Sequence, residues 1–171
     1  AGHGFRVNRF LAADIADGYA LDGTFEPHDA RSQPSAAGSM DTTIKDQAKL
    51  WAAIVRGDLL SKRVHEMLVE PQIPLTTARQ FPTLAPSSDP RGPEIGLSAG
   101  LGLIVFNDPS GAMLMKGGHN DWTGNIVVCQ IALQRCVVAL GNSVRAEMIY
   151  PALLEFILGE TKTPWWWEYA E

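Results

Sequence analysis

The amino-acid sequence predicts a single α+β domain over residues 1–171, in which helices precede an antiparallel sheet and one helix follows it. Three observations support this fold class. Apolar residues recur at helical spacing between residues 43 and 57, apolar runs separated by turns follow over 98–142, and a further helical pattern covers 145–159. A chain of 171 residues is long enough for one hydrophobic core and short for two.

Two helices are expected in the first half of the chain. The first begins after Thr43, whose hydroxyl can accept a hydrogen bond from the N–H of Asp46. It ends at Gly57, because glycine tolerates the left-handed conformation of a helix end. The second helix lies in "LLSKRVHEMLVE", with Ser61 as its N-cap. We expect both helices to turn an apolar face towards the core.

Residues 71–97 are expected to form a long irregular connection. Six of the eleven prolines fall between positions 71 and 93. Proline lacks a backbone donor and restricts the residue before it, so regular structure is disfavoured there. Long loops in a compact domain serve either as functional lids or as insertions that wrap the surface. The residues leave both alternatives open.

A meander of three to four antiparallel strands with flanking helices is expected over residues 98–142. The runs "LGLIVF", "AMLMK", "GNIVVCQIAL" and "CVVALGN" are almost continuously apolar, which is typical of strands covered on both faces. Cys129 and Cys136 would lie on adjacent strands if a hairpin turn separates them. We expect two free buried thiols, because free cysteine is commonly buried. A cross-strand disulfide is the geometrically possible alternative.

The C-terminal helix is expected over residues 145–159. Pro151 either kinks this helix or marks its first turn. The following "WWW", at positions 165–167, docks on the domain's own surface, covers a face that is exposed because an N-terminal part is absent, or forms an exposed patch for interaction.

Charge and composition exclude several classes of function. The net charge of −5 argues against a nucleic-acid partner, since no dense run of Lys and Arg is present to neutralise phosphates. No apolar stretch reaches the roughly 20 residues that a membrane span requires. The histidines and cysteines lack the spacing of a metal site, so neither a metal nor a cofactor is expected.

The candidate site lies where a predicted strand ends in polar residues, in "MLMKGGHNDWTGN" at positions 113–125. Lys116, Gly117, Gly118 and His119 follow the apolar part of the strand directly. Asn120 and Asp121 are typical of a turn, because short polar side chains bond to the nearby backbone. On these residues alone, the segment is either a polar turn or one wall of an active site.

Five segments, in chain order, carry a wider pattern. They are "ADGYALDGTFEP", "SAAGSMDTTIKDQAKLWAAIVRGDLLSK", "GLSAGLGLIVF", "MKGGHNDWTGN" and "VVALGNS". Together they resemble the serine β-lactamase, penicillin-binding DD-peptidase and related esterase superfamily, in its class C-like branch. The fourth segment is similar to the third active-site motif, written Lys-Thr-Gly or His-x-Gly in that superfamily. The resemblance implies that the chain forms the C-terminal part of the β-lactamase/transpeptidase-like fold.

The resemblance also implies roles for the four residues at the strand end. Lys116 would fix a substrate carboxylate and set the potential around the nucleophile. Gly117 and Gly118 belong to the same wall, and Gly118 would let the substrate approach the strand closely. The N–H of His119 would donate to the developing oxyanion of an acyl-transfer reaction. The imidazole of His119 either faces the cleft or packs against the domain.

The nucleophile of that superfamily is missing from this sequence. The superfamily uses Ser-x-x-Lys, in which the serine is acylated, and no serine of this chain has Lys three positions later. We therefore expect that this chain is the C-terminal part of a serine hydrolase and is inactive alone. Its expected partners are the N-terminal portion of the same protein, a small amide or ester substrate and a second copy of itself. The alternative is a non-catalytic binding or interaction module.

Overall fold

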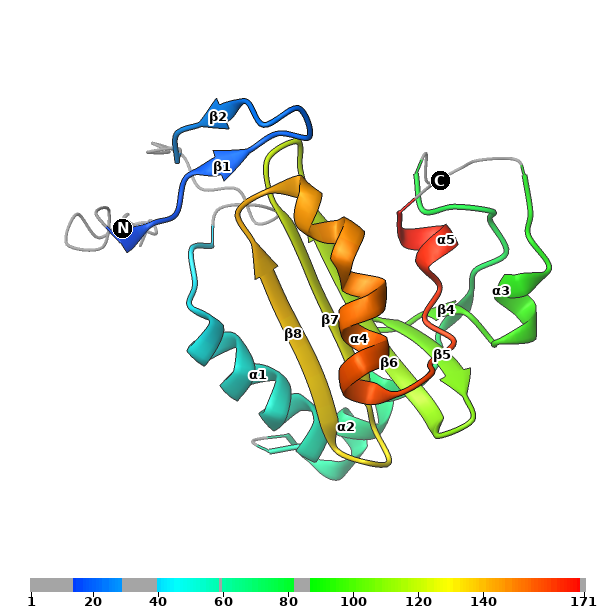
Figure 1. Ribbon diagram of the computed structural model, residues 1–171. Helices are drawn as coiled ribbons and strands as arrows, with labels where there is room; N and C mark the ends of the chain where they lie inside the picture. The colour runs from blue at the N-terminus through cyan, green and yellow to red at the C-terminus, as the bar shows by residue number, and fades with distance from the viewer. Residues whose placement is uncertain (1–13, 29–39, 59, 82–86, 170–171) are drawn as a thin grey trace, which may run out of the picture.

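The computed structural model describes residues 14–28, 40–58, 60–81 and 87–169. Within these residues the chain has an α+β fold, with a six-stranded antiparallel sheet and helices packed on both of its faces (Figure 1). The predicted α+β class is confirmed. None of the helices in the described ranges is long and apolar enough to cross a membrane.

The helices and strands have the following bounds. The helices are α1 (Ile44–Arg56), α2 (Lys62–Val69), α3 (Arg91–Glu94), α4 (Tyr150–Leu158) and α5 (Trp165–Glu168), with the 3₁₀ helix η2 (Val144–Ile149) before α4. The strands are β1 (Gly18–Tyr19), β2 (Phe25–Glu26), β3 (Ile73–Pro74), β4 (Ser98–Ala99), β5 (Ile104–Asp108), β6 (Gly111–His119), β7 (Gly124–Gln130) and β8 (Arg135–Gly141). Strands β1 and β2 form a separate two-stranded ribbon.

The main sheet runs in chain order from β3 to β8, and each strand is antiparallel to its neighbours. The expectation of three to four strands was therefore wrong. The additional strands are β3 and β4, which contain only two residues each. Two residues are too few to show an alternating pattern. Strand β3 also contains Pro74, and proline is tolerated on a sheet edge, where β3 lies.

The sheet separates two apolar clusters. On one face, Met113 and Met115 of β6 pack with Leu154 of α4. On the other face, Leu114 of β6 packs with Trp51 of α1. Successive side chains of a strand point to opposite faces, so the residues of β6 alternate between the α4 side and the α1 side.

The predicted helix ends are present. The side chain of Thr43 accepts a hydrogen bond from the N–H of Asp46 at 3.1 Å, and Gly57 ends α1 with φ of 73°. The side chain of Ser61 caps α2 by accepting from the N–H of Val64. Pro151 lies in the first turn of α4, after η2, which decides between the two alternatives for this proline.

Cys129 and Cys136 form a disulfide, so the expectation of free thiols was wrong. The two residues lie directly opposite each other on β7 and β8, with a Cα–Cα distance of 4.1 Å. Such a short separation is typical of the pairs in an antiparallel ladder that exchange no hydrogen bonds. The turn between the strands sets this register, and the register brings the two thiols together.

Candidate functional site

The predicted site residues, Lys116 to His119, form the last part of β6. Pairing with β5 stops at Met115, which lies opposite Ile104, whereas pairing with β7 continues to His119, opposite Gly124. Within the described residues, the end of β6 therefore has a neighbouring strand on only one side. Its other edge is open.

The hydrogen-bond pattern shows which backbone groups point to the open edge. The N–H of Asn120 donates to the carbonyl of Thr123, and the N–H of Ile131 donates to the carbonyl of Ala112. In an antiparallel ladder the bonding direction alternates with every residue. Even-numbered residues of β6 thus bond to β7, and the backbone groups of Gly117 and His119 point to the opposite, open edge.

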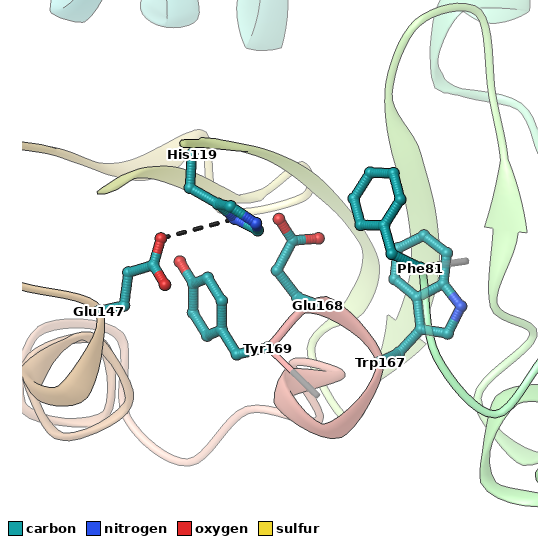
Figure 2. A pocket seen from close by; sticks show the side chains of 6 residues that line it. All are labelled: Phe81, His119, Glu147, Trp167, Glu168 and Tyr169. Atoms are coloured by element: carbon teal, nitrogen blue, oxygen red, sulfur yellow. Dashed lines mark ion pairs between the residues drawn. The ribbon is translucent and has the colours of Figure 1, made fainter. Parts of the chain in front are cut away.

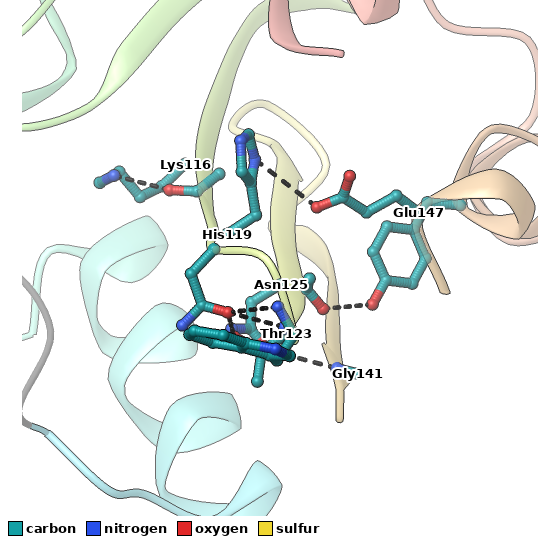
Figure 3. Close-up of polar contacts among 11 residues, drawn as sticks. Lys116, His119, Thr123, Asn125, Gly141 and Glu147 are labelled. Atoms are coloured by element: carbon teal, nitrogen blue, oxygen red, sulfur yellow. Dashed lines mark hydrogen bonds and ion pairs between the residues drawn. The ribbon is translucent and has the colours of Figure 1, made fainter. Parts of the chain in front are cut away.

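The four side-chain positions divide between the two faces of the sheet. Lys116 and Gly118 lie on the α1 side, and Gly117 and His119 lie on the α4 side, by the alternation along β6. Lys116 is exposed, and its Nζ donates to the carbonyl oxygen of Gly117 at 2.6 Å (Figure 3). The lysine thereby bonds to a backbone acceptor at the open edge.

The two glycines have different surroundings. A Cβ added at Gly118 would meet no described atom within 4 Å, whereas a Cβ added at Gly117 would overlap the carboxylate of Glu168. Among the described residues, the strand is therefore closely approached at Gly117 and not at Gly118. The approaching group is a side chain of the same protein.

Asn120 holds the turn after β6. Its Oδ1 accepts from the N–H groups of Trp122 and Thr123, both at 2.8 Å, and from the hydroxyl of Thr123 at 3.1 Å. The carbonyl of Trp122 accepts from the N–H of Tyr19, which attaches the β1–β2 ribbon to this turn. The expected turn role of Asn120 is present, and it places His119 at the end of the strand.

The Trp-rich tail docks on the domain itself. Trp167 is 4% exposed and belongs to the same core cluster as Met115. Its Nε1–H donates to Oγ1 of Thr77 at 3.1 Å, and its carbonyl accepts from the N–H of Gln80 at 2.8 Å. The expected docking of residues 165–167 on the domain's own surface is therefore observed, and the tail lies against the connection that follows β3.

This docking creates a pocket beside the end of β6, with a volume of about 270 Å³ (Figure 2). Its lining comes from four parts of the chain. The lining residues are Phe81, His119, Glu147, Trp167, Glu168 and Tyr169. Figure 2 shows the carboxylates of Glu147 and Glu168 on either side of the His119 ring.

Both acidic residues of the pocket are held in a dehydrated environment. Burial raises the pKa of Glu147 to about 7. Burial also raises the pKa of Glu168, against the opposing charges of His119 and Lys116. Oε1 of Glu147 lies 3.5 Å from Nδ1 of His119, close enough for an ion pair but not aligned as a hydrogen bond.

Sequence reasoning identified His119 and missed the acidic and tyrosine residues around it. Glu147 follows β8 and Glu168 lies in the tail, so neither forms a motif with residues 116–119. Only the return of η2 and α5 to the end of β6 brings them together. In the part of the chain that the structure describes, no three His, Cys, Asp or Glu residues are grouped as metal ligands.

Comparison of the chain with models of known protein families, with curated proteins and with solved structures found no match.

Proposed function

We propose that this chain supplies the strand wall of a serine hydrolase of the β-lactamase, DD-peptidase and esterase type, which acts through an acyl-serine intermediate. The observation that carries the proposal is the open edge of β6 over residues 116–119. A strand wall of this type needs backbone donors and acceptors that no neighbouring strand occupies.

Two backbone groups and one side chain at the open edge support this role. The N–H of His119 points to it and would donate to the oxyanion of a carbonyl placed beside the strand. The carbonyl of Gly117 faces the same edge and would accept an N–H of the substrate, in place of the Lys116 ammonium that it accepts now. That ammonium would then be available for a substrate carboxylate.

The proposed reaction needs a nucleophile from outside this sequence. No serine of the chain precedes a lysine by three positions, so the acylated serine and its lysine would belong to an N-terminal portion. The isolated chain is expected to hydrolyse neither a chromogenic β-lactam nor a p-nitrophenyl ester. Serine-dependent turnover by the isolated chain would contradict this assignment.

The role of Lys116 is tested in a longer protein that joins this chain to a Ser-x-x-Lys segment. Lys116→Ala is expected to lower kcat/KM for a β-lactam, a D-Ala peptide or an ester by about 10²-fold, the usual cost of losing one group that stabilises a transition state. Lys62→Ala is the matched control, because Lys62 lies on α2 and its side chain is 91% exposed. An equal loss in both variants would contradict the proposed wall.

A second candidate, a non-catalytic binding module, is favoured by the position of Glu168. Its carboxylate covers Gly117, so the α4 side of the strand end is already filled by the chain's own tail. The reading frame upstream of residue 1 separates the two candidates. A Ser-x-x-Lys followed by Tyr-x-Asn there supports the hydrolase, and a frame without them supports the module.

A further inference from the structure

The pocket between β6, η2 and α5 contains polar atoms that no described group satisfies. Oε1 of Glu147, Oε2 of Glu168 and Oη of Tyr169 are buried and have no hydrogen-bond partner among the described residues. Glu168 is only 4% exposed. Buried polar atoms in folded proteins nearly always have partners, because burial without a hydrogen bond costs free energy.

The chemistry of these three atoms defines what would complement them. A carboxyl group accepts hydrogen bonds and cannot donate once it is ionised, whereas a tyrosine hydroxyl can both donate and accept. A donor that carries positive charge would complement both carboxyl groups, because it favours their ionised form against the burial that raises their pKa. His119 does not supply this donor fully, since its Nδ1 lies 3.5 Å from Glu147 without hydrogen-bond alignment.

Aromatic side chains make up the rest of the pocket wall. Phe81, Trp167 and Tyr169 line it together with the acidic residues (Figure 2). The ring of Phe81 lies edge-on to that of His119, with centroids 6.4 Å apart. Aromatic faces attract cations and also bury an apolar body. The volume of about 270 Å³ lies at the lower end of the range of small-molecule sites, so the expected ligand is small.

We propose that this pocket binds a primary ammonium group carried on a small apolar or aromatic body. Glu147 and Glu168 accept its N–H donors, and the aromatic rings surround its carbon part. An ammonium group carries three donors and no acceptor, which matches the unsatisfied oxygens of Glu147 and Glu168 in their ionised form. The described residues contain no cluster of metal ligands, so an organic cation fits better than a metal ion.

This ligand site does not depend on the proposed hydrolase function. The pocket shares the His119 side chain with the strand end, whereas the proposed wall uses the backbone N–H of His119 and the ammonium of Lys116 on the α1 side. The chain as it stands contains every lining residue, so binding can be measured without a nucleophile. A failure of the ligand site would leave the strand wall untouched, and the reverse also holds.

The test is an NMR titration of the ¹⁵N-labelled chain with benzylammonium chloride. Saturable shifts are expected at the Trp167 indole N–H and at the backbone amides of Gly117 and His119. Benzyl alcohol, which has the same body without the charge, is expected to bind at least about tenfold more weakly, the usual difference between charged and neutral hydrogen-bonded groups. Tetramethylammonium, a cation without N–H donors, is also expected to bind more weakly.

Isosteric variants assign the binding to the two carboxylates. Glu147→Gln and Glu168→Gln are each expected to raise the Kd for benzylammonium at least about tenfold. Glu155→Gln is the matched control, because it removes the same charge from an exposed position on α4. The two pocket variants change different elements, so either one provides the test if the other fails to fold.

Four outcomes would overturn the proposal. They are the absence of saturable shifts in the folded wild-type chain, equal affinity for benzyl alcohol, equal affinity for tetramethylammonium, and unchanged Kd in the folded pocket variants. The first would indicate that the unsatisfied atoms bond only to water. The second and third would indicate an aromatic pocket without the charged hydrogen bonds that define the site.

Discussion

Gly117 and Gly118 show how strongly position decides the role of a single residue. They are adjacent in β6, yet one lies beneath the Glu168 carboxylate and the other faces open space within the described structure. The difference arises because successive residues of a strand point to opposite faces of the sheet. A short motif such as Lys-Gly-Gly therefore combines two different environments.

The substitution Gly117→Ala is expected to lower the free energy of unfolding by about 1–3 kcal/mol, because the added methyl group overlaps the buried Glu168 carboxylate and displaces that side chain. Gly118→Ala is the matched control and is expected to change it by no more than about 0.5 kcal/mol. Chemical denaturation measures both. The double variant Gly117→Ala/Glu168→Ala should recover part of the loss, and equal losses in the two glycine variants would show that α5 does not cover Gly117.

Glu147 is expected to make stability depend on pH. Its pKa of about 7 in the folded protein lies above the ordinary value of 4.5. Between about pH 4.5 and pH 7 the folded state therefore binds more protons than the unfolded state. The stabilisation that comes from this raised pKa is complete below about pH 4.5 and is lost as the pH rises through about 7. The titratable groups that face it are His119, Tyr150, Glu168 and Tyr169.

Denaturation of the Glu147→Gln variant between pH 5 and 8 checks this prediction. The variant is expected to lose less stability than the wild type over this range and to be the more stable of the two at pH 8, by about 1 kcal/mol. The control variant Glu155→Gln, on the exposed side of α4, should show the same pH dependence of stability as the wild type. Parallel pH curves for the Glu147 variant and the wild type would contradict the raised pKa.

At the scale of elements, the sheet ends differently at its two sides. Strand β3 forms one edge through two residues that include Pro74, which lacks a backbone donor. Strand β8 forms the other edge and is joined to β7 by the disulfide between Cys129 and Cys136. The β7–β8 hairpin is thus held by a covalent bond as well as by its ladder.

The disulfide predicts the chemistry of the two cysteines. The unfolded, unreduced protein is expected to show no reactive thiol towards a thiol reagent, and both thiols should appear after reduction. The variant Cys129→Ala/Cys136→Ala is expected to lower the free energy of unfolding by about 2–3 kcal/mol, the loop-entropy contribution for a short closed loop. Reactive thiols in the unreduced chain would show that the pair is not oxidised.

At the scale of the whole molecule, apolar side chains gather on the outer side of η2 and α4. Phe156 is 88% exposed and Met148 is 76% exposed. The residue after each of them in the chain, Ile157 and Ile149, is also exposed. Uncovered apolar surface of this kind favours association, because association removes it from water.

We therefore expect the chain to self-associate, with a sedimentation coefficient that rises with protein concentration. Phe156→Glu is expected to weaken this dependence, since it places a charge in the apolar surface. Leu133→Glu is the matched control, because Leu133 is 53% exposed in the turn between β7 and β8. A wild-type chain that remains monomeric at high concentration would contradict the prediction.

The sequence by itself determined the elements whose signals are local. Thr43, Gly57 and Ser61 mark helix ends through bonds within one turn, and the apolar runs after residue 98 mark strands through their own composition. The same local rules identified the polar strand end at residues 116–119 and the turn at Asn120. Each of these features depends on residues only a few positions apart.

The tertiary structure alone decided the rest. The Cys129–Cys136 bond depends on the register of two strands, and the extra strands β3 and β4 depend on neighbours that their two residues cannot specify. The pocket depends on η2 and α5 returning to the end of β6, which brings Glu147 and Glu168 beside His119. Such contacts join segments far apart in the chain, and only packing of the folded core selects them.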